Sequence, residues 1–187
     1  MYLVIHGFTS SSKSHKAQQL RKWLAAQGRE SEWICPDLPI DPAAAIEILS
    51  DIIEQAIQSG QTPKLVGSSL GGFYANILAA RYSLKAVLIN PAVRAGLVLR
   101  DAIGPHKNWH DDGMQEFTQA HIDALNAMDI LAPADPDKLF LMTEMGDETL
   151  DWQHGAAYYR DCHQLTFRGG NHSFSRFESV LTLIDDF

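Results

Sequence analysis

Residues 64–72 read KLVGSSLGG. An aliphatic run passes here into a cluster of small residues, and a helical pattern follows over residues 70–82. Residues 67–71 match G-x-S-x-G, a motif in which a sharp turn between a strand and a helix carries a nucleophilic serine. The residues two before and two after that serine come so close that only very small side chains fit. Gly67 and Gly71 satisfy this rule around Ser69, whereas Ser68 would have Val66 and Leu70 at these positions. We therefore predict Ser69 as a nucleophile; the alternative is a Gly- and Ser-rich turn without chemistry.

Short apolar runs alternate with helical patterns along most of the chain. Continuous apolar strands between helices predict a parallel sheet that is covered by helices on both faces. The sequence thus predicts an α/β fold with a mainly parallel sheet of about six strands. Asp41 is expected to cap a helix that starts at Pro42. The expected strands cover residues 2–5, 33–35, 64–67, 86–89, 139–142 and 164–167, and the expected helices begin near residues 13, 42 and 70.

Residues 93–137 interrupt this alternation, and we call them the cap segment. About 45 residues are too many for one crossover helix in a compact sheet. The segment contains a candidate helix over residues 97–103, a break at Gly104-Pro105 and an amphipathic stretch over residues 114–128. Phe117, His121 and Leu125 would share one face of that stretch. We expect one α/β domain over residues 1–187, with a small helical cap inserted at about residues 93–137.

A histidine near the end of the chain is the expected base. A serine hydroxyl is a weak nucleophile at neutral pH and needs a base, which in turn needs an orienting acid. In folds with this serine turn, the order along the chain is serine, acid, histidine. His163 begins or precedes the last strand, at the wrong end of the sheet, whereas His172 follows it through a Gly-rich loop at the carboxyl end. We predict His172 as the base; the alternative is a capping or solvent-exposed histidine.

The acid should follow the preceding strand. Asp147 lies in the loop directly after residues 139–142, and Asp151 lies about one turn later, where the next helix is expected to begin. We predict Asp147 as the acid and keep Asp151 as the alternative, although a carboxylate in a first helical turn has a structural role of its own. Asp147 could itself be a helix N-cap.

Two backbone N–H groups are candidates to bind a developing oxyanion. One belongs to Leu70, directly after the predicted nucleophile, and the other to Phe8, in the loop that follows the first strand. Gly7 would let this backbone approach closely. His6 is then expected to fix the loop and not to act as a base.

Other motifs are weaker. His106, His110, Asp111 and Asp112 cluster in the cap segment, but no third fixed ligand is evident, and a polar solvent loop is the preferred interpretation. No phosphate-binding G-x-x-x-x-G-K motif occurs, and G-x-G-x-x-G is not satisfied from Gly67. We expect that no metal takes part in the chemistry.

Composition restricts the partners and the compartment. The chain has 187 residues, 15 Lys and Arg against 23 Asp and Glu, and a net charge of −8. This balance argues against nucleic acid or an anionic membrane as the main partner. No apolar run is long enough for a membrane helix, and the N-terminus lacks the features of a signal peptide. Cys35 and Cys162 could pair at most once. A cytoplasmic protein with a small-molecule partner is the resulting expectation.

Together, these motifs resemble a known family. The segments are residues 6–8 (HGF) with serines after them, 66–72 (VGSSLGG), 90–93 (NPAV), 146–148 (GDE) and 169–172 (GGNH). Over almost the whole chain they resemble α/β-hydrolases, and more narrowly the small bacterial esterases of the YqiA type. The resemblance implies a minimal α/β-hydrolase that cleaves carboxylic esters, and also acyl thioesters, without a cofactor. It implies Ser69, Asp147 and His172 as a catalytic triad, and it leaves the cap segment and the substrate open.

The expected activity is therefore ester hydrolysis through an acyl-enzyme, with short to medium acyl chains because the cap segment and the sheet are small. An acyl-CoA thioesterase with the same triad is the alternative within enzymes. A non-catalytic protein that binds ligands on a hydrolase fold is the alternative from another class.

Overall fold

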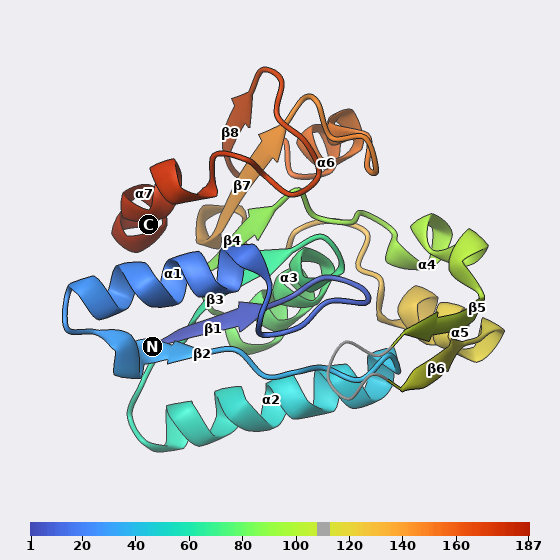
Figure 1. The fold of residues 1–187 in the computed structure, drawn as a ribbon, viewed down its shortest axis with the longest axis horizontal. Helices are drawn as coiled ribbons and strands as arrows, with labels where there is room; N and C mark the ends of the chain where they lie inside the picture. Colours follow the sequence, from blue (N-terminus) through green and yellow to red (C-terminus); the bar gives the residue numbers. More distant parts are fainter. Residues whose placement is uncertain (108–112) are drawn as a thin grey trace.

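A computed structural model of the chain describes residues 1–107 and 113–187. Six strands form one sheet in the order β2-β1-β3-β4-β7-β8, and every neighbouring pair is parallel (Figure 1). The predicted α/β class and the six predicted strands are therefore confirmed. The strands are β1 (Tyr2–Ile5), β2 (Trp33–Ile34), β3 (Lys64–Ser68), β4 (Ala86–Ile89), β7 (Leu139–Glu144) and β8 (His163–Phe167).

The strands are continuously apolar because both faces of the sheet are buried. Successive side chains point to opposite faces of a sheet, and β1 illustrates this. Leu3 and Ile5 belong to one core cluster, together with residues of α2 (Pro42–Gln58) and α3 (Leu70–Tyr82). Tyr2 and Val4 belong to a second cluster, with residues of α1 (His15–Ala26) and α7 (Leu181–Asp186). The sheet is thus the middle layer of a three-layer structure.

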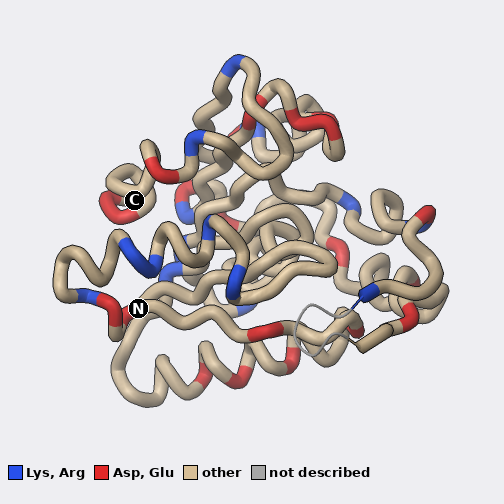
Figure 2. Tube along the Cα trace, in the orientation of Figure 1, with Lys and Arg blue, Asp and Glu red and all other residues tan. Residues whose placement is uncertain are grey.

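The helices follow the capping and patterning expected from the sequence. Asp41 Oδ1 accepts a hydrogen bond from the Ala43 N–H at 2.9 Å, and Pro42 opens α2 as predicted. Acidic residues lie along the solvent side of α2 (Figure 2). In contrast, α3 is buried over nearly its whole length, because it lies between the sheet and its neighbours. Outside the cap segment the remaining helix is α6 (Trp152–Tyr158), and short 3₁₀ turns are η1 (Glu30–Glu32) and η4 (Phe177–Val180).

The cap segment contains a hairpin as well as helices. Strands β5 (Gly104–Lys107) and β6 (Met114–Phe117) pair antiparallel, so the amphipathic stretch over residues 114–128 begins as a strand and is helical only from Gln119, as α5 (Gln119–Met128). Thr118 ends the strand and caps this helix, and its backbone N–H donates to His121 Nδ1 at 3.2 Å. The expected break at Gly104-Pro105 is the start of β5. The other elements are α4 (Ala95–Val98), η2 (Arg100–Ala102) and η3 (Pro136–Lys138).

Of the predicted His and Asp cluster in the cap segment, only His106 can be placed. His106 Nε2 lies 2.6 Å from the Ala102 carbonyl oxygen. His110, Asp111 and Asp112 lie outside the described residues. Within residues 1–107 and 113–187, no three His, Cys, Asp or Glu side chains are arranged to hold a metal ion, and no helix is long and apolar enough to cross a membrane.

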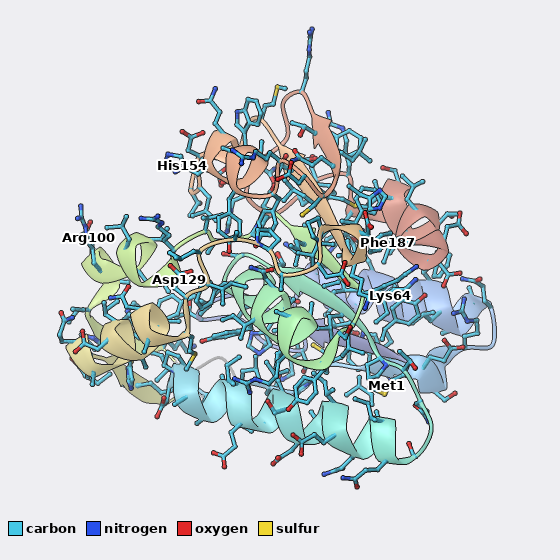
Figure 3. The ribbon with its side chains drawn as sticks, turned by 180° about the vertical axis from the view of Figure 1, so that it is seen from behind. Met1, Lys64, Arg100, Asp129, His154 and Phe187 are labelled. Carbon is cyan, nitrogen blue, oxygen red and sulfur yellow. The ribbon has the colours of Figure 1, made fainter. Side chains whose placement is uncertain are left out.

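The C-terminal helix is tied to the amino ends of β1 and β3. Arg29 Nη1 donates to both carboxylate oxygens of Asp185, at 2.9 and 3.0 Å, and the Tyr2 hydroxyl donates to the same carboxylate. Lys64 Nζ donates to the backbone carbonyls of Ile184 and Asp185, so Lys64 lies near the C-terminal end of the chain (Figure 3). These contacts hold the end of the sheet that is opposite the carboxyl ends of the strands.

Candidate active site

Ser69 stands in a strained turn between β3 and α3. Its φ is 56° and its ψ is −122°, a conformation that a non-glycine residue rarely adopts. The neighbouring glycines make this turn sterically possible. A Cβ on Gly67 would lie 2.2 Å from the Gly71 carbonyl oxygen, and one on Gly71 would lie 2.0 Å from the Ile5 carbonyl oxygen. Direct contact with backbone atoms therefore causes the requirement for very small residues on both sides of Ser69, and Gly67 and Gly71 meet it.

The structure brings the three predicted side chains together in one chain of hydrogen bonds. His172 Nε2 lies 3.1 Å from Ser69 Oγ, and His172 Nδ1 lies 2.8 and 3.0 Å from the two carboxylate oxygens of Asp147. A carboxylate accepts hydrogen bonds, so the ring proton belongs on Nδ1 and the lone pair of Nε2 faces the serine hydroxyl. This tautomer can accept the hydroxyl proton. Ser68, one residue earlier, has no part in this chain of contacts.

Asp147 is held from two sides. Its side chain is 2% exposed, and its Oδ1 accepts hydrogen bonds from the Thr149 and Leu150 N–H groups at 2.9 and 2.8 Å. Burial raises the pKa of this carboxyl, but the hydrogen bonds from His172, Leu150 and Thr149 outweigh it, and the net pKa is lowered. Asp147 is therefore ionised near neutral pH and keeps a fixed orientation toward the imidazole.

Asp151, the alternative acid, occupies the N-cap of α6. Its side chain accepts from the Gln153 N–H at 2.9 Å and is half exposed. This is the structural role that a carboxylate at the start of a helix was expected to have. Asp147 also bonds N–H groups that follow it, so the expected turn-capping role and the contact with His172 coexist in one residue.

Glu144 anchors the loop that carries His172, and the sequence analysis did not identify it. This carboxylate is fully buried at the end of β7. It accepts from the Asn171 N–H at 2.7 Å, from the Ser175 N–H and hydroxyl, and from Arg176 Nη1 at 3.0 Å. We call residues 168–176 the histidine loop. Burial raises the pKa of Glu144, but the hydrogen bonds from the histidine loop lower it by more than burial raises it. The net pKa of Glu144 is therefore below its usual value.

Asn90 adds a second anchor from the neighbouring strand. It directly follows β4, is buried, and has a left-handed φ of 39°. Its Oδ1 accepts from the Glu144 N–H at 2.9 Å, and its Nδ2 donates to the Asn171 and His172 carbonyls at 3.1 and 3.2 Å. The strand that carries the acid and the loop that carries His172 are thus joined through one amide side chain.

The loop after β1, residues 6–10, packs against Ser69, and we call it the N-terminal loop. A Cβ on Gly7 would lie 3.2 Å from the Ser69 Cβ, which shows how closely the two backbones approach. Phe8 follows in this loop, and its ring packs edge-on against Phe117 with centroids 4.9 Å apart. Leu70 is the first residue of α3, and an N–H at this position has no acceptor within its own helix.

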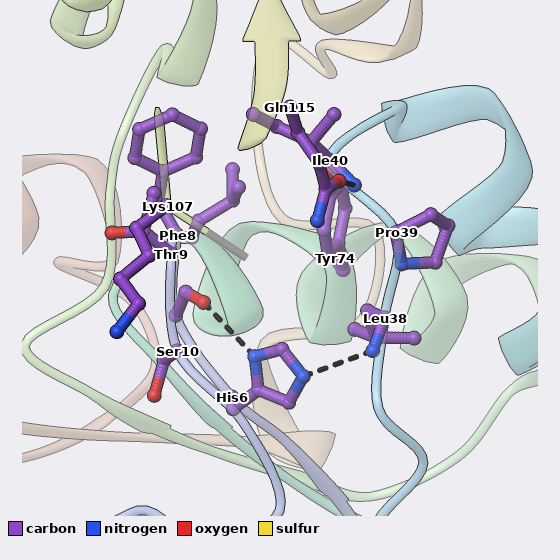
Figure 4. A pocket seen from close by; sticks show the side chains of 12 residues that line it. His6, Phe8, Thr9, Ser10, Leu38, Pro39, Ile40, Tyr74, Lys107 and Gln115 are labelled. Carbon is purple, nitrogen blue, oxygen red and sulfur yellow. Dashed lines mark hydrogen bonds between the residues drawn. The ribbon is translucent and has the colours of Figure 1, made fainter. Parts of the chain in front are cut away.

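His6 fixes the N-terminal loop. Its ring nitrogen Nε2 accepts from the Leu38 N–H at 3.0 Å, so the ring proton belongs on Nδ1, which donates to the Gly7 carbonyl oxygen at 3.0 Å (Figure 4). His6 is buried. Both ring nitrogens therefore make contacts that hold the loop beside Ser69, which matches its expected structural role.

Two cavities lie on the two sides of the N-terminal loop. The smaller one, of about 30 Å³, is lined by the loop and by residues that include Leu38, Ile40, Leu70 and Tyr74 (Figure 4). The larger one, of about 160 Å³, is bordered by Ser69 and His172 themselves. We call these the small cavity and the Ser69 cavity. Both cavities are lined by His6, Gly7, Phe8 and Ser10.

Residues 1–187 match, over their whole length, the family described as an uncharacterised protein family, UPF0227. The chain belongs to the UPF0227 family. Solved structures similar to this UPF0227 chain include proteins described as an alpha/beta hydrolase, an esterase domain and a lipase. Est1E from Butyrivibrio proteoclasticus has a TM-score of 0.74 at 16% identity, with 100% of this chain and 85% of that chain covered. For the mouse alpha/beta hydrolase domain-containing protein 10, the TM-score is 0.76 at 18% identity, with 99% and 88% covered.

A third similar structure is a soluble variant of monoglyceride lipase from Saccharomyces cerevisiae, in complex with a substrate analog. Its TM-score is 0.66 at 14% identity, with 99% of the UPF0227 chain and 83% of that chain covered. At such identities the likeness is one of fold. The UPF0227 chain therefore has the α/β-hydrolase fold that the sequence motifs predict, and the function rests on its own residues.

Proposed function

We propose that this chain is a serine hydrolase that cleaves carboxylic esters through an acyl-enzyme. The observation that carries the proposal is the unbroken series of hydrogen bonds from Ser69 Oγ through the His172 ring to Asp147. A serine in a strained turn, a histidine of the correct tautomer and a buried, ionised carboxylate are together what nucleophilic acyl transfer requires.

In the proposed reaction, Ser69 Oγ attacks the acyl carbonyl carbon while His172 Nε2 takes the hydroxyl proton. The carbonyl oxygen then carries the negative charge, and in this proposal the Leu70 and Phe8 N–H groups stabilise it. His172 returns the proton to the leaving alcohol as the ester bond breaks. A water molecule repeats the sequence on the acyl-enzyme, with His172 again as the base, and releases the acid and free Ser69. Asp147 stabilises the imidazolium in both halves.

The small cavity supports a preference for short to medium acyl chains. Its lining includes the apolar side chains of Leu38 and Ile40 close to Leu70 and Phe8, so an acyl group whose carbonyl oxygen faces these N–H groups would extend toward it. A volume of about 30 Å³ is room for roughly one or two methylene groups, so a longer acyl chain would extend beyond this cavity. Thioesters with the same acyl groups would use the same residues, and they are the second substrate class to test.

A screen of phenyl esters and the corresponding thioesters over acyl lengths tests this function. We expect turnover of short to medium esters, with the rate falling for long-chain emulsified lipids. A fluorophosphonate probe should label the wild type and leave Ser69→Ala unlabelled. Absence of both turnover and labelling would favour a non-catalytic protein that binds ligands on this fold.

A further inference from the structure

Each of the two cavities beside the N-terminal loop is bordered by a lysine. Lys107 lines the small cavity, and Lys16 lines the Ser69 cavity. Among the described residues that line either cavity, none is an aspartate or a glutamate. The chain as a whole carries a net charge of −8, and acidic residues lie on several of its elements (Figure 2). The side chains that line the two cavities thus include two lysines and no carboxylate, whereas the Asp147 carboxylate lies behind the His172 ring, on its Nδ1 side.

Lys16 is placed to interact with a group inside the Ser69 cavity. Its ammonium donates to the Ser173 carbonyl oxygen at 3.0 Å, next to His172. An ammonium has three N–H donors, and within the described parts of the chain one of them is used, in the hydrogen bond to Ser173. Ser10 and Ser14 also line the cavity, so hydroxyl groups stand near the same space. The Lys16 ammonium and these hydroxyl groups can each donate a hydrogen bond to a group in the cavity.

The position of Lys16 is not explained by the stability of its helix. Lys16 lies in the first turn of α1, where the helix dipole disfavours a cation. Burial lowers the pKa of Lys16, while the carboxylates of Asp147 and Glu144 oppose this change. An anion in the Ser69 cavity would compensate both the desolvation and the helix dipole.

We propose that the Ser69 cavity binds an anionic group of the substrate, a carboxylate or a phosphate, through Lys16. This inference rests on the proposed function and narrows its substrate class to esters that carry a negative charge on the acyl or the alcohol part. The ammonium would pair with the anion while Ser10 and Ser14 donate hydrogen bonds to it. Charge-assisted hydrogen bonds of this kind are stronger than neutral ones and would place the ester next to Ser69.

Pairs of esters that are similar in size and differ chiefly in charge test the proposal. On the alcohol side, 4-acetoxybenzoate is compared with its methyl ester, and 4-acetoxyphenyl phosphate separates phosphate from carboxylate. On the acyl side, monophenyl succinate is compared with phenyl butyrate. The quantity measured is the ratio of kcat/KM for the anionic ester to that for the neutral ester. This ratio is independent of any general loss of activity in a variant.

The variants are Lys16→Met and Lys16→Arg, with Lys13→Met as the matched control, because Lys13 is exposed in the same region. In at least one pair, we expect Lys16→Met to lower the ratio by about 10–100-fold, the size of an ionic hydrogen bond. Lys16→Arg should retain most of the ratio, and Lys13→Met should leave it unchanged. Added salt should also lower the ratio in the wild type.

An equal loss on anionic and neutral esters in Lys16→Met would overturn the proposal, because it would assign Lys16 only to holding the Ser173 carbonyl. A wild type that hydrolyses the neutral esters, with ratios that Lys16→Met does not change, would also overturn it while the proposed function stands. A wild type that hydrolyses none of these esters and does not react with a fluorophosphonate would contradict the proposed function itself.

Discussion

Glu144 ends β7 and Asp147 stands in the turn that follows it, and both carboxylates bind the loop that carries His172. Glu144 binds the backbone of the histidine loop on either side of His172, whereas Asp147 binds the imidazole itself. The end of a single strand therefore sets both the position of the loop and the orientation of the ring. A substitution of Glu144 should therefore lower the catalytic rate through the position of His172, although Glu144 contacts none of the reacting atoms.

We expect Glu144→Gln to lower kcat about 10–100-fold, since a shift of His172 by about 1 Å can cost two orders of magnitude. The NH₂ group of the glutamine would face the N–H donors of the histidine loop, and the hydrogen bonds to that side of the carboxylate would be lost. The free energy of unfolding should therefore fall by about 1–3 kcal/mol. A low-field proton signal of His172 Nδ1–H, followed by NMR, should move or broaden. Glu178→Gln is the control, because Glu178 is exposed in the adjacent turn.

If Glu144→Gln lost stability but kept kcat and the low-field signal, Glu144 would be a structural residue only. A rise in KM with kcat unchanged would point to a role in binding instead of positioning.

The two candidate acids should differ strongly. Asp147→Asn should lower kcat by up to about 10⁴-fold, because the imidazole loses the carboxylate that fixes its tautomer and stabilises its charge. Asp151→Asn should lose at most a few-fold in kcat, since its carboxylate caps α6 and an asparagine can cap as well. Steady-state kinetics on both purified variants, with circular dichroism to check folding, measures the difference. The reverse ranking would move the acid to Asp151.

Acid should destabilise the protein through the histidine loop. The folded pKa of Glu144 lies below its usual value of 4.5, and that of Asp147 lies below its usual value of 3.8. A lowered folded pKa means that the carboxylate adds stability above the usual pKa and loses it as the pH falls through the folded value. The urea midpoint of the wild type should therefore fall steadily below about pH 4.5.

The same titration with Glu144→Gln should show a smaller fall, because one of the carboxylates with a lowered folded pKa no longer takes up a proton on unfolding. Parallel curves for the wild type and the variant would contradict the assignment of this pH dependence to Glu144.

The turn at Ser69 should tolerate no side chain at Gly71. A Cβ there would meet the Ile5 and His6 carbonyl oxygens at 2.0 and 2.6 Å, and both belong to the backbone. We expect Gly71→Ala to lower the free energy of unfolding by more than about 3 kcal/mol, or to prevent folding. Gly155→Ala in α6 is the matched control, since its Cβ would make ordinary contacts with the Thr143 and Leu141 side chains of β7, at 3.9 and 4.0 Å. It should be neutral or stabilise by up to about 1 kcal/mol. Urea unfolding of both variants makes the comparison.

Most of the fold could be predicted because a parallel sheet with helices on both faces has strands that are continuous apolar runs in the sequence. The serine turn could be predicted as well, because steric contact leaves only glycine at Gly67 and Gly71. The loop positions of Asp147 and His172 follow from the same strand pattern, since both come after the carboxyl end of a strand. Local patterns carry all of these features.

The features that were missed depend on partners distant in sequence. Strand β5 has no apolar pattern and forms through pairing with β6. Because β6 occupies Met114–Phe117, the amphipathic stretch over residues 114–128 is helical only from Gln119. A buried carboxylate such as Glu144 cannot be recognised from an apolar pattern, because its burial depends on donors in the histidine loop. Lys16 likewise acquires its position beside Ser69 only through the packing of α1 on the sheet.

The most direct measurement of the central claim is ester turnover and fluorophosphonate labelling of the wild type, Ser69→Ala and Ser68→Ala under identical conditions. Ser69→Ala should lose about 10⁴–10⁶-fold in kcat and all labelling, while the thermal midpoint stays close to that of the wild type. Ser68→Ala should keep its labelling and most of its turnover, because its side chain takes no part in the hydrogen-bond chain to His172. Loss of labelling and turnover in Ser68→Ala, with both retained in Ser69→Ala, would contradict the account.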